Sequence, residues 1–261
     1  MSQHLDGYYE NPVLWQPTRY VGLDSMRVQK ATQWLPVEAH FVLDVGCGNG
    51  VLTDQLTGQH QAIGVDRSWS ALQWVKSPHA QADVGQLPFK ANAFDGLVCM
   101  EVLEHLPLSV FTRALSELVR VTRRYLLITV PYCEDREAVR VGCPACGCQF
   151  HPNYHMRSFT RPQVEQLLQQ WPQMVARRVE AIVPTPRLRY QFLFRWLRQI
   201  RRKPLPFPQS AICPQCGYAS PPGFTTGTQP PQPSSGYRWW HKFWPKENSF
   251  VWWMALYEKR G

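Results

Sequence analysis

Apolar runs and helical spacings alternate along the first half of the chain. Four short apolar runs are typical of buried strands, at residues 41–45, 62–65, 94–100 and 125–130. Before and between them, apolar residues recur at helical spacing, at residues 25–35, 51–57, 68–76 and 109–123. Strands that alternate with helices predict an α/β fold, in which a doubly wound, mostly parallel sheet is covered on both faces.

The second half of the chain is less regular. We expect a helix over residues 160–170 with Thr160 as its N-cap, and strands over residues 174–183 and 249–258. Residues 187–203 have the pattern of a basic amphipathic helix. The first half therefore predicts the sheet, and the second half adds strands to it together with irregular segments.

The composition is typical of a one-domain protein, and it does not identify the binding partner. The chain has 261 residues, 44% of them hydrophobic, which is enough for one domain with its own core. Residues 1–20 carry no signal-like pattern, and no apolar run approaches the roughly 20 residues of a membrane helix, so we expect a soluble, cytoplasmic protein. The formal charge of +9 favours anionic partners such as nucleic acid, anionic lipid or phosphorylated glycans.

A glycine-rich turn follows the first apolar run. Three glycines stand at alternate positions after Asp44, namely Gly46, Gly48 and Gly50, and their bare backbone lets a ligand approach closely. A second acid, Asp66, ends the next strand, where it can accept hydrogen bonds from a ribose. A dinucleotide fingerprint would need another glycine directly after Gly50, where valine stands, so a cationic ligand fits better than a pyrophosphate.

The later motifs follow in an order known from one enzyme family. Asp83 precedes Leu-Pro-Phe, and Phe94-Asp95 leads to a Glu-Val-Leu-Glu-His run that begins at Glu101. With the glycine turn, these motifs resemble those of class I S-adenosylmethionine-dependent methyltransferases of the type 11-like group, here with a zinc-knuckle insertion. The resemblance covers about residues 40–130 and a final strand pair. It implies a Rossmann-like sheet whose penultimate strand is parallel and whose last strand is antiparallel.

The resemblance also implies which residues hold the cofactor, S-adenosylmethionine. Asp44, Gly46 and Gly48 would surround its methionine portion, Asp66 its ribose, and Asp83 with Val84 its adenine. The full set of predicted cofactor residues is Asp44, Gly46, Cys47, Gly48, Asp66, Arg67, Asp83, Val84 and Glu101. Because the sulfonium donor is already activated, holding the acceptor in line supplies much of the rate, and often one base removes a proton.

Two C-P-x-C-G units predict a zinc site. Cys143 and Cys146 belong to the first unit, Cys213 and Cys216 to the second, and two such pairs of thiolates form a closed tetrahedral site with a structural role. The separation of 70 residues between the units is long for one metal site. However, the family topology makes both segments leave the same edge of the sheet, where a metal could join them.

Other interpretations of the cysteines remain open. One is a ligand set in which Cys148 and His151 join Cys143 and Cys146, and another is that the thiols are free. The remaining cysteines are interpreted as small buried apolar residues: Cys47, Cys99 and Cys133.

A second metal is a further hypothesis. Glu101, Glu104 and His105 share one face of a helical turn, so that they could converge on a hard ion such as magnesium. A similar E-x-x-E-H occurs in small-RNA 2′-O-methyltransferases and ubiquinone-pathway O-methyltransferases, and His155, ahead of an aromatic-Thr-Arg run, would be the fourth ligand. Many relatives carry Glu-His here without a metal. In either case His105 and His155 are the candidate general bases.

The basic, aromatic part of the second half has three interpretations. Residues 187–203 hold seven Arg and Lys among bulky apolar side chains, and Trp239, Trp240, Phe243 and Trp244 follow later. Such a segment can lie on a membrane surface or bind a lipid-linked substrate, or it can bind nucleic acid. In the third interpretation its apolar side covers the core and its basic side faces the solvent. Peripheral membrane contact therefore stays open, and nucleic acid is the less favoured partner.

These inferences predict one enzyme with a zinc-clipped cap. The expected division is an N-terminal segment with a helix (1–40), a methyltransferase domain (41–183 and 249–261) and cap insertions (132–157 and 184–248). The expected reaction is S-adenosylmethionine-dependent O-methylation of a small-molecule, glycan or lipid-linked acceptor. The alternatives are RNA 2′-O-methylation and a catalytically silent, zinc-stabilised binding module.

Overall fold

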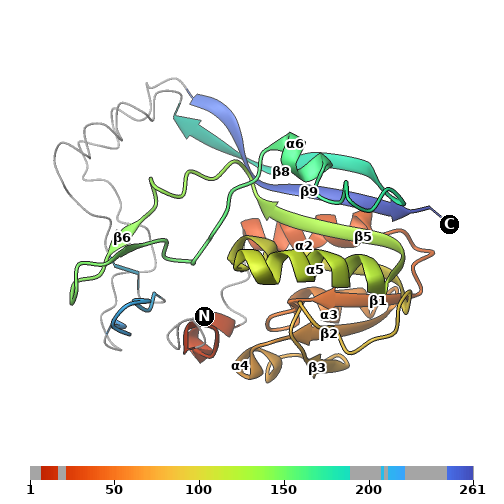
Figure 1. Cartoon of the computed structure of the whole chain (residues 1–261), viewed down its shortest axis with the longest axis horizontal. Coiled ribbons are helices and arrows are strands. Elements are labelled where there is room, and N and C mark those ends of the chain that lie inside the picture. The colour runs from red at the N-terminus through yellow and green to blue at the C-terminus, as the bar shows by residue number, and fades with distance from the viewer. Residues whose placement is uncertain (1–6, 17–21, 189–206, 209–210, 221–245, 261) are drawn as a thin grey trace.

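The computed structural model describes residues 7–16, 22–188, 207–208, 211–220 and 246–260 (Figure 1). Most of the predicted basic helix and the aromatic residues at positions 239–244 lie outside the described residues. No helix within the described ranges is long and apolar enough to cross a membrane.

Seven strands form one sheet in the order β3-β2-β1-β4-β5-β9-β8. Their bounds are β1 Phe41–Val45, β2 Gln61–Asp66, β3 His79–Gln81, β4 Phe94–Met100, β5 Thr122–Pro131, β8 Met174–Leu188 and β9 Lys246–Lys259. The first five strands are mutually parallel, and β9 runs antiparallel to both β5 and β8. The doubly wound α/β prediction is confirmed, including the parallel penultimate strand and the antiparallel last strand.

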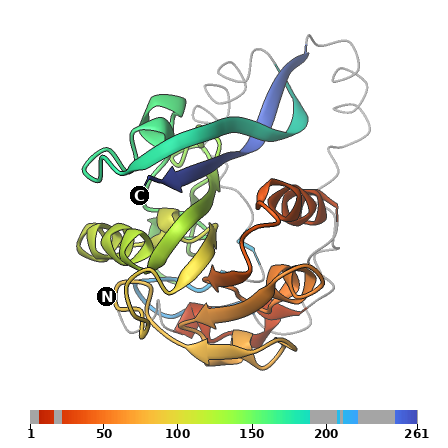
Figure 2. The ribbon, with the colours of Figure 1, turned by 90° about the vertical axis from the view of Figure 1, so that its right-hand side faces the viewer.

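Two layers of helices cover the sheet (Figure 2). Their bounds are α2 Leu23–Trp34, α3 Val51–Leu56, α4 Trp69–Leu72, α5 Leu108–Val121 and α6 Arg161–Glu165, with short 3-10 turns η1 Pro12–Trp15 and η3 Leu103–His105. One core packs α2 and α3 against alternate strand residues such as Val42 and Leu127. The other packs α5 and α6 against the intervening residues, such as Leu43 and Leu126. The central strands are buried on both faces, which explains their continuous apolar runs.

Three predicted elements differ from the structure. Helix α4 stops at Leu72, because the backbone N–H groups of Lys76 and Ser77 turn to Asp54 Oδ1, at 3.3 and 2.9 Å. Helix α6 begins after Thr160 in a capping box but ends at Glu165, where the chain passes into turns. Strand β8 continues through Leu188, so the first two residues of the predicted basic helix pair with β9 instead.

A smaller module lies beyond the carboxyl ends of the parallel strands (Figure 1). Strands β6 Val141–Gly142 and β7 Gln149–Phe150 form a two-stranded sheet, and Ile212 bridges to Ala219 in a second, separate turn. A small core joins these segments to the N-terminal residues, and its buried members include Tyr8, Val141, Phe150, Tyr154, Ala211 and Cys213. Segments that are far apart in the sequence therefore meet over one edge of the main sheet.

Candidate active site

The glycine turn after β1 is built tightly. Gly46 has a φ of +73°, and a Cβ atom on it would lie 2.2 Å from Val102 Cγ2, so no other residue fits without a shift. The backbone N–H groups of Gly46 and Cys47 both donate to Val65 O, at 2.8 and 3.0 Å. This closure fixes the turn at the carboxyl ends of β1 and β2.

Two buried acids flank the turn. Asp44 accepts a hydrogen bond from Thr53 Oγ1 at 2.7 Å, and burial raises the pKa of Asp44 to about 7. Asp66 accepts from the backbone N–H groups of Gly48 and Ser68, each at 2.8 Å, and burial raises its pKa as well. Asp66 thus holds the glycine turn against β2.

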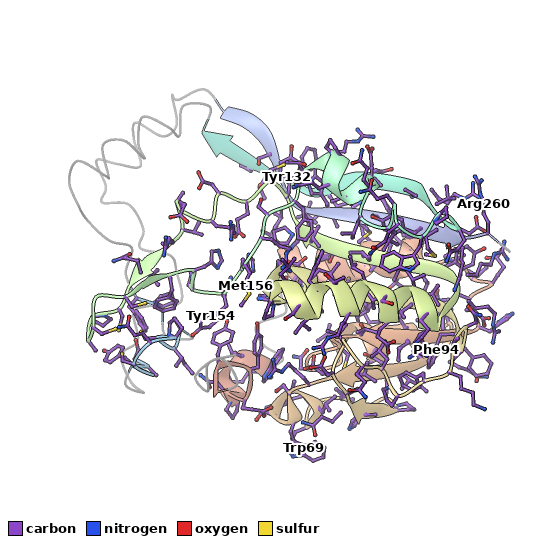
Figure 3. All side chains as sticks on the ribbon, in the orientation of Figure 1. Trp69, Phe94, Tyr132, Tyr154, Met156 and Arg260 are labelled. Atoms are coloured by element: carbon purple, nitrogen blue, oxygen red, sulfur yellow. The ribbon has the colours of Figure 1, made fainter. Side chains whose placement is uncertain are left out.

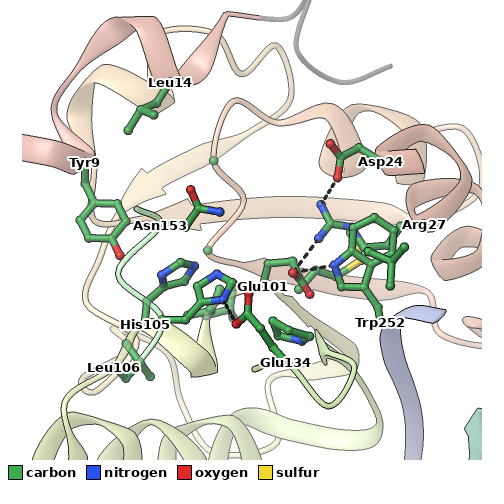
Figure 4. Close-up of a pocket in the computed structure, with 18 of the residues that line it drawn as sticks. Tyr9, Leu14, Asp24, Arg27, Glu101, His105, Leu106, Glu134, Asn153 and Trp252 are labelled. Atoms are coloured by element: carbon green, nitrogen blue, oxygen red, sulfur yellow. Dashed lines mark hydrogen bonds and ion pairs between the residues drawn. The ribbon is translucent and has the colours of Figure 1, made fainter. Parts of the chain in front are cut away.

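The predicted residues lie together around a cavity of about 1460 Å³ that described residues line, part of which Figure 4 shows. All nine predicted cofactor residues and both predicted bases line it. Their functional roles remain predictions, but the structure brings them together. Pockets for one small ligand usually measure about 300–1,000 Å³, so this cavity has room for a cofactor and a second molecule.

Glu101 is held by three side chains at the end of β4. Its Oε2 accepts from Trp252 Nε1 at 2.7 Å and pairs with Arg27 Nη1 at 3.3 Å, and its Oε1 accepts from Thr129 Oγ1 at 3.2 Å (Figure 4). Arg27 also pairs with Asp24 at 3.1 Å. Sequence reasoning missed Arg27 and Trp252, because each stands alone, far from the motifs in the sequence.

The N-terminal residues 7–16 close one side of the cavity. Asn49 of the glycine turn donates to Trp15 O at 2.9 Å, and Ser68 Oγ donates to Tyr9 O at 2.7 Å. Both oxygens of Glu10 accept from backbone N–H groups at the start of α4, at 3.0 and 2.9 Å. A segment that reads as irregular in the sequence is thus tied directly to the predicted cofactor loop.

The two predicted bases lie next to each other. The His105 and His155 rings meet edge to face with centroids 4.8 Å apart. Burial, reinforced by the neighbouring His155, lowers the pKa of His105 to about 3. Glu134, which sequence reasoning missed, lies 2.5 Å from His155 Nδ1 and 3.2 Å from His151 Nε2. Figure 4 labels Glu134 near His105 in the cavity, and Figure 3 labels Tyr154 and Met156, the chain neighbours of His155.

The predicted magnesium site finds no support. Donor atoms of Glu104, His105 and His155 lie within 4.8 Å of one another, but both oxygens of Glu101 are engaged elsewhere. Burial, with Glu101 nearby, raises the pKa of Glu104 well above its usual value. A hard cation prefers several ionised oxygen ligands, and this cluster offers one buried carboxyl with two imidazoles.

The two cysteine units do come together. The Sγ atoms of Cys143 and Cys216 lie 3.7 Å apart, those of Cys146 and Cys213 3.6 Å apart, and all four lie within 4.8 Å of one another. Tetrahedral zinc with Zn–S bonds of about 2.3 Å separates its sulfurs by roughly 3.8 Å, so the donor set fits zinc. Cys148 is outside this group of four, and His151 contacts Glu134 instead.

The prediction that the three remaining cysteines are buried holds for two of them. Cys47 and Cys99 are buried, as expected of small apolar residues. Cys133 is exposed, and its φ of +43° places it in a sharp turn directly after β5, so its predicted burial is wrong.

Comparison with known proteins agrees with this geometry. A family model described as a methyltransferase domain matches residues 43–126. The chain is 36% identical over 97 residues to a ubiquinone biosynthesis O-methyltransferase of Coxiella burnetii, covering 33% of this chain and 41% of that protein. It is 31% identical over 113 residues to the O-methyltransferase cnsE of Penicillium expansum, covering 38% and 41%. The chain therefore spans about two fifths of the length of these curated relatives.

Solved structures share the fold at low identity. The structure of an S-adenosylmethionine-dependent methyltransferase of Thermotoga maritima, a possible histamine N-methyltransferase, superposes with a TM-score of 0.54 at 14% identity and covers 100% of both chains. The magnesium protoporphyrin IX methyltransferase of Synechocystis with bound SAH superposes with a TM-score of 0.53 at 17% identity, over 69% of this chain and 92% of that one. At these identities the likeness is one of fold.

Proposed function

Because the chain carries a class I S-adenosylmethionine-dependent methyltransferase domain, we propose that it transfers the methyl group of S-adenosylmethionine to a hydroxyl oxygen of a small, glycan or lipid-linked acceptor. The O-methyltransferase names of the two curated relatives support this reaction class. The observation that carries the proposal is the cavity, which joins the predicted cofactor residues to two partly buried histidines in one space.

The cofactor end of the cavity suits a cationic donor. Asp44 and Asp66 are buried beside the glycine turn, and a carboxylate there favours the ammonium group and the ribose hydroxyls of S-adenosylmethionine. We assign the carboxylate of the methionine portion to Arg27, which lines the same end and is 8% exposed. Its guanidinium is held in place by Asp24 at 3.1 Å and by Glu101 at 3.3 Å.

The charge of the cavity selects against phosphates. Among its described lining residues, seven side chains are carboxylates and only two are cationic, Arg27 and Arg67. Arg27 pairs with Glu101, and Arg67 lies over the Tyr9 ring, 5.6 Å from its centroid, both at the cofactor end. The lining also includes apolar and aromatic side chains, namely Leu106, Val110, Tyr132, Met156 and Phe250. These features favour a neutral, apolar hydroxyl compound over an RNA backbone.

His155 is the better of the two candidate bases. A general base works best when its pKa is near the working pH, and the pKa of His105 is lowered to about 3. His105 then acts as a neutral wall of the site, and His155 removes the acceptor proton.

We also propose that zinc occupies the four-cysteine cluster with a structural role. A closed set of four thiolates leaves no coordination position for a substrate. The metal would join the segment after β5 to the segment that follows β8, and so would hold the cap over the cavity.

The proposed function is tested with methyl-labelled S-adenosylmethionine and extract from cells that lack the protein. The extract is separated into lipid, glycan, small-molecule, RNA and protein fractions after reaction. Label in the first three fractions supports O-methylation of a small, glycan or lipid-linked acceptor, and label in RNA or protein contradicts it.

Two controls make the experiment specific. Asp66→Ala removes the carboxylate that holds Gly48 and Ser68, so it should lose cofactor binding and all labelling. Asp95→Ala is the matched control, because Asp95 lies at the far end of β4 in an ion pair with Arg123. Failure of the wild-type protein to bind S-adenosylmethionine by calorimetry would favour a silent binding module.

A further inference from the structure

Glu134 contacts two histidine rings, one through each carboxylate oxygen. Its Oε2 lies 2.5 Å from His155 Nδ1, and its Oε1 lies 3.2 Å from His151 Nε2. The two rings stack with centroids 4.4 Å apart and planes inclined by 18°. The side chains of His151 and His155 are 7% and 9% exposed, so these contacts are largely shielded from water.

The hydrogen bonds around His151 fix its tautomer. Its Nδ1 accepts from the backbone N–H groups of Asn153 and His155, both at 3.2 Å. A nitrogen that accepts two N–H donors carries no proton, so a neutral His151 is protonated at Nε2 and donates to Glu134. To ligate a metal through Nε2, His151 would have to lose this proton and become an anionic imidazolate. We therefore interpret His151, Glu134 and His155 as a hydrogen-bonded relay.

The tautomer of His155 follows from the same logic. Although burial opposes ionisation, hydrogen bonds from His151 and His155 lower the pKa of Glu134 to about 2, so Glu134 is a carboxylate that only accepts. His155 must therefore donate through Nδ1, which leaves a lone pair on its Nε2. His155 and His105 line the cavity, and donor atoms of Glu104, His105 and His155 lie within 4.8 Å of one another.

Two loops are tied together to hold this arrangement. Tyr132 bridges to Phe159, and Arg136 Nη1 donates to Met156 O at 2.5 Å, so the segment after β5 runs beside residues 154–159. Tyr154, which stands between the two histidines in the sequence, donates to the backbone oxygen of Ile212, directly before the second cysteine unit. Contacts on three sides thus set the position of the relay.

We propose that His151 and Glu134 are positioning residues that fix His155 as the general base for the acceptor hydroxyl, an inference that rests on the proposed function. The acceptor O–H bond breaks as His155 Nε2 takes the proton, and the oxygen electron pair forms the bond to the methyl carbon. The carbon–sulfur bond breaks with its electron pair returning to sulfur, which yields the neutral thioether product. The imidazolium of His155 is stabilised by Glu134 until it releases the proton to water.

The tautomers can be measured without any acceptor. In the intact protein with ¹⁵N-labelled histidine, two-bond ¹H–¹⁵N spectra at neutral pH should show an unprotonated Nε2 for His155 and an unprotonated Nδ1 for His151. The opposite protonation of His155 would overturn the relay even if the protein is an O-methyltransferase. Conversely, the spectra could show the expected tautomers while the labelling experiment identifies RNA as the acceptor. Failure of the relay and failure of the proposed function are therefore distinguishable.

Kinetics test the role of the relay in turnover. With methyl-labelled S-adenosylmethionine and the labelled acceptor fraction, Glu134→Gln should lower kcat by about tenfold to a hundredfold and leave KM for S-adenosylmethionine unchanged. Because the carboxylate no longer stabilises the imidazolium, the acid limb of the kcat profile should move to lower pH. Glu134→Asp should recover part of kcat. If Glu134 only stabilised the fold, its replacement would not shift the acid limb of the kcat profile.

The matched control is Glu137→Gln. Glu137 lies on the same loop, 76% exposed, in an ion pair with Arg140, so this variant should behave like the wild-type protein. An unchanged pH profile in Glu134→Gln would overturn the proposal. So would wild-type activity that a chelator abolishes and that Mg²⁺ or Mn²⁺ restores, because the cluster would then hold a metal.

Discussion

The guanidinium of Arg27 lies 4.5 Å from the centre of the Trp252 ring, and it reaches from there to Glu101. Arg27 belongs to α2 and Trp252 to β9, so the two ends of the described chain meet at this point of the cavity. The contact joins an ion pair and a cation–π interaction in a nearly buried position. Changes to Arg27 should therefore affect both stability and cofactor binding.

Arg27→Met keeps much of the side-chain volume and removes the charge. We expect it to lower the free energy of unfolding by about 1–3 kcal/mol, because Glu101 loses its cation in a shielded site. S-adenosylmethionine should bind about tenfold more weakly, measured by calorimetry. Gln29→Ala, exposed on the same helix, is the control, and equal effects of the two variants would refute the assignment of Arg27.

Asp44 predicts a link between pH and cofactor affinity. Burial raises its pKa to about 7, so below this pH the empty site holds a protonated Asp44. A cationic donor favours the ionised carboxylate, so binding must expel the proton, and affinity should rise as pH increases from 6 to 8. Calorimetry in buffers of different ionisation enthalpy should count about one proton released at pH 6. No change in affinity over this range would contradict the assignment of Asp44.

The same group predicts the stability of the empty protein. Because the pKa of Asp44 is higher in the folded state than in the unfolded chain, its contribution to stability is full below about pH 4 and is lost as pH rises through 7. The difference is on the order of 4 kcal/mol. Denaturant unfolding should show a smaller loss of stability between pH 4 and 8 in Asp44→Asn than in the wild-type protein.

The close approach of Gly46 to Val102 can be tested by a double-mutant cycle. Gly46→Ala should destabilise the protein by about 2–4 kcal/mol, because the new Cβ meets Val102 Cγ2 and the φ of +73° strains an alanine. Adding Val102→Ala removes the clash, so the double variant should be more stable than the sum of the single effects. Additive effects, measured by thermal unfolding, would exclude the contact.

Metal content tests the cysteine cluster. The wild-type protein should contain about one zinc per chain, and Cys213→Ser should lose it and melt at lower temperature, because three thiolates bind zinc less firmly. Cys133→Ser is the matched control, since Cys133 is outside the cluster. Elemental analysis that finds equal zinc in the two variants would exclude the shared site.

The central strands could be predicted from the sequence because their burial is uniform. Strands β1 and β4 begin and end at the predicted residues, since a parallel strand covered on both faces reads as an unbroken apolar run. Helices α4 and α6 were predicted too long. After α4 the backbone N–H of Ser77 turns to the distant Asp54, and after α6 the chain passes into local turns. Strand β8 was predicted too short, because its pairing with β9 extends beyond the apolar pattern.

The candidate site divides in the same way. The gathering of the predicted cofactor residues around one cavity could be foreseen because they stand in short motifs at strand ends, and the meeting of the four cysteines because each C-P-x-C-G unit is locally complete. Their roles stay predictions. Arg27, Glu134 and Trp252 could not, because each acquires its role only from a partner that is distant in the sequence. His151 and His155 were each named as candidate ligands, but the carboxylate of Glu134 that contacts both rings was not foreseen.

Because β9 lies between β5 and β8, the sheet can be completed only after β9 has been synthesised. This strand is made after all the others, yet it lies between β5 and β8, so β8 cannot join the sheet before residues 246–259 are available. Trp252, which contacts both Arg27 and Glu101, arrives on the same strand. During synthesis, a ribosome-bound chain that stops before Lys246 would leave an edge of β5 open to aggregation and its cavity unfinished.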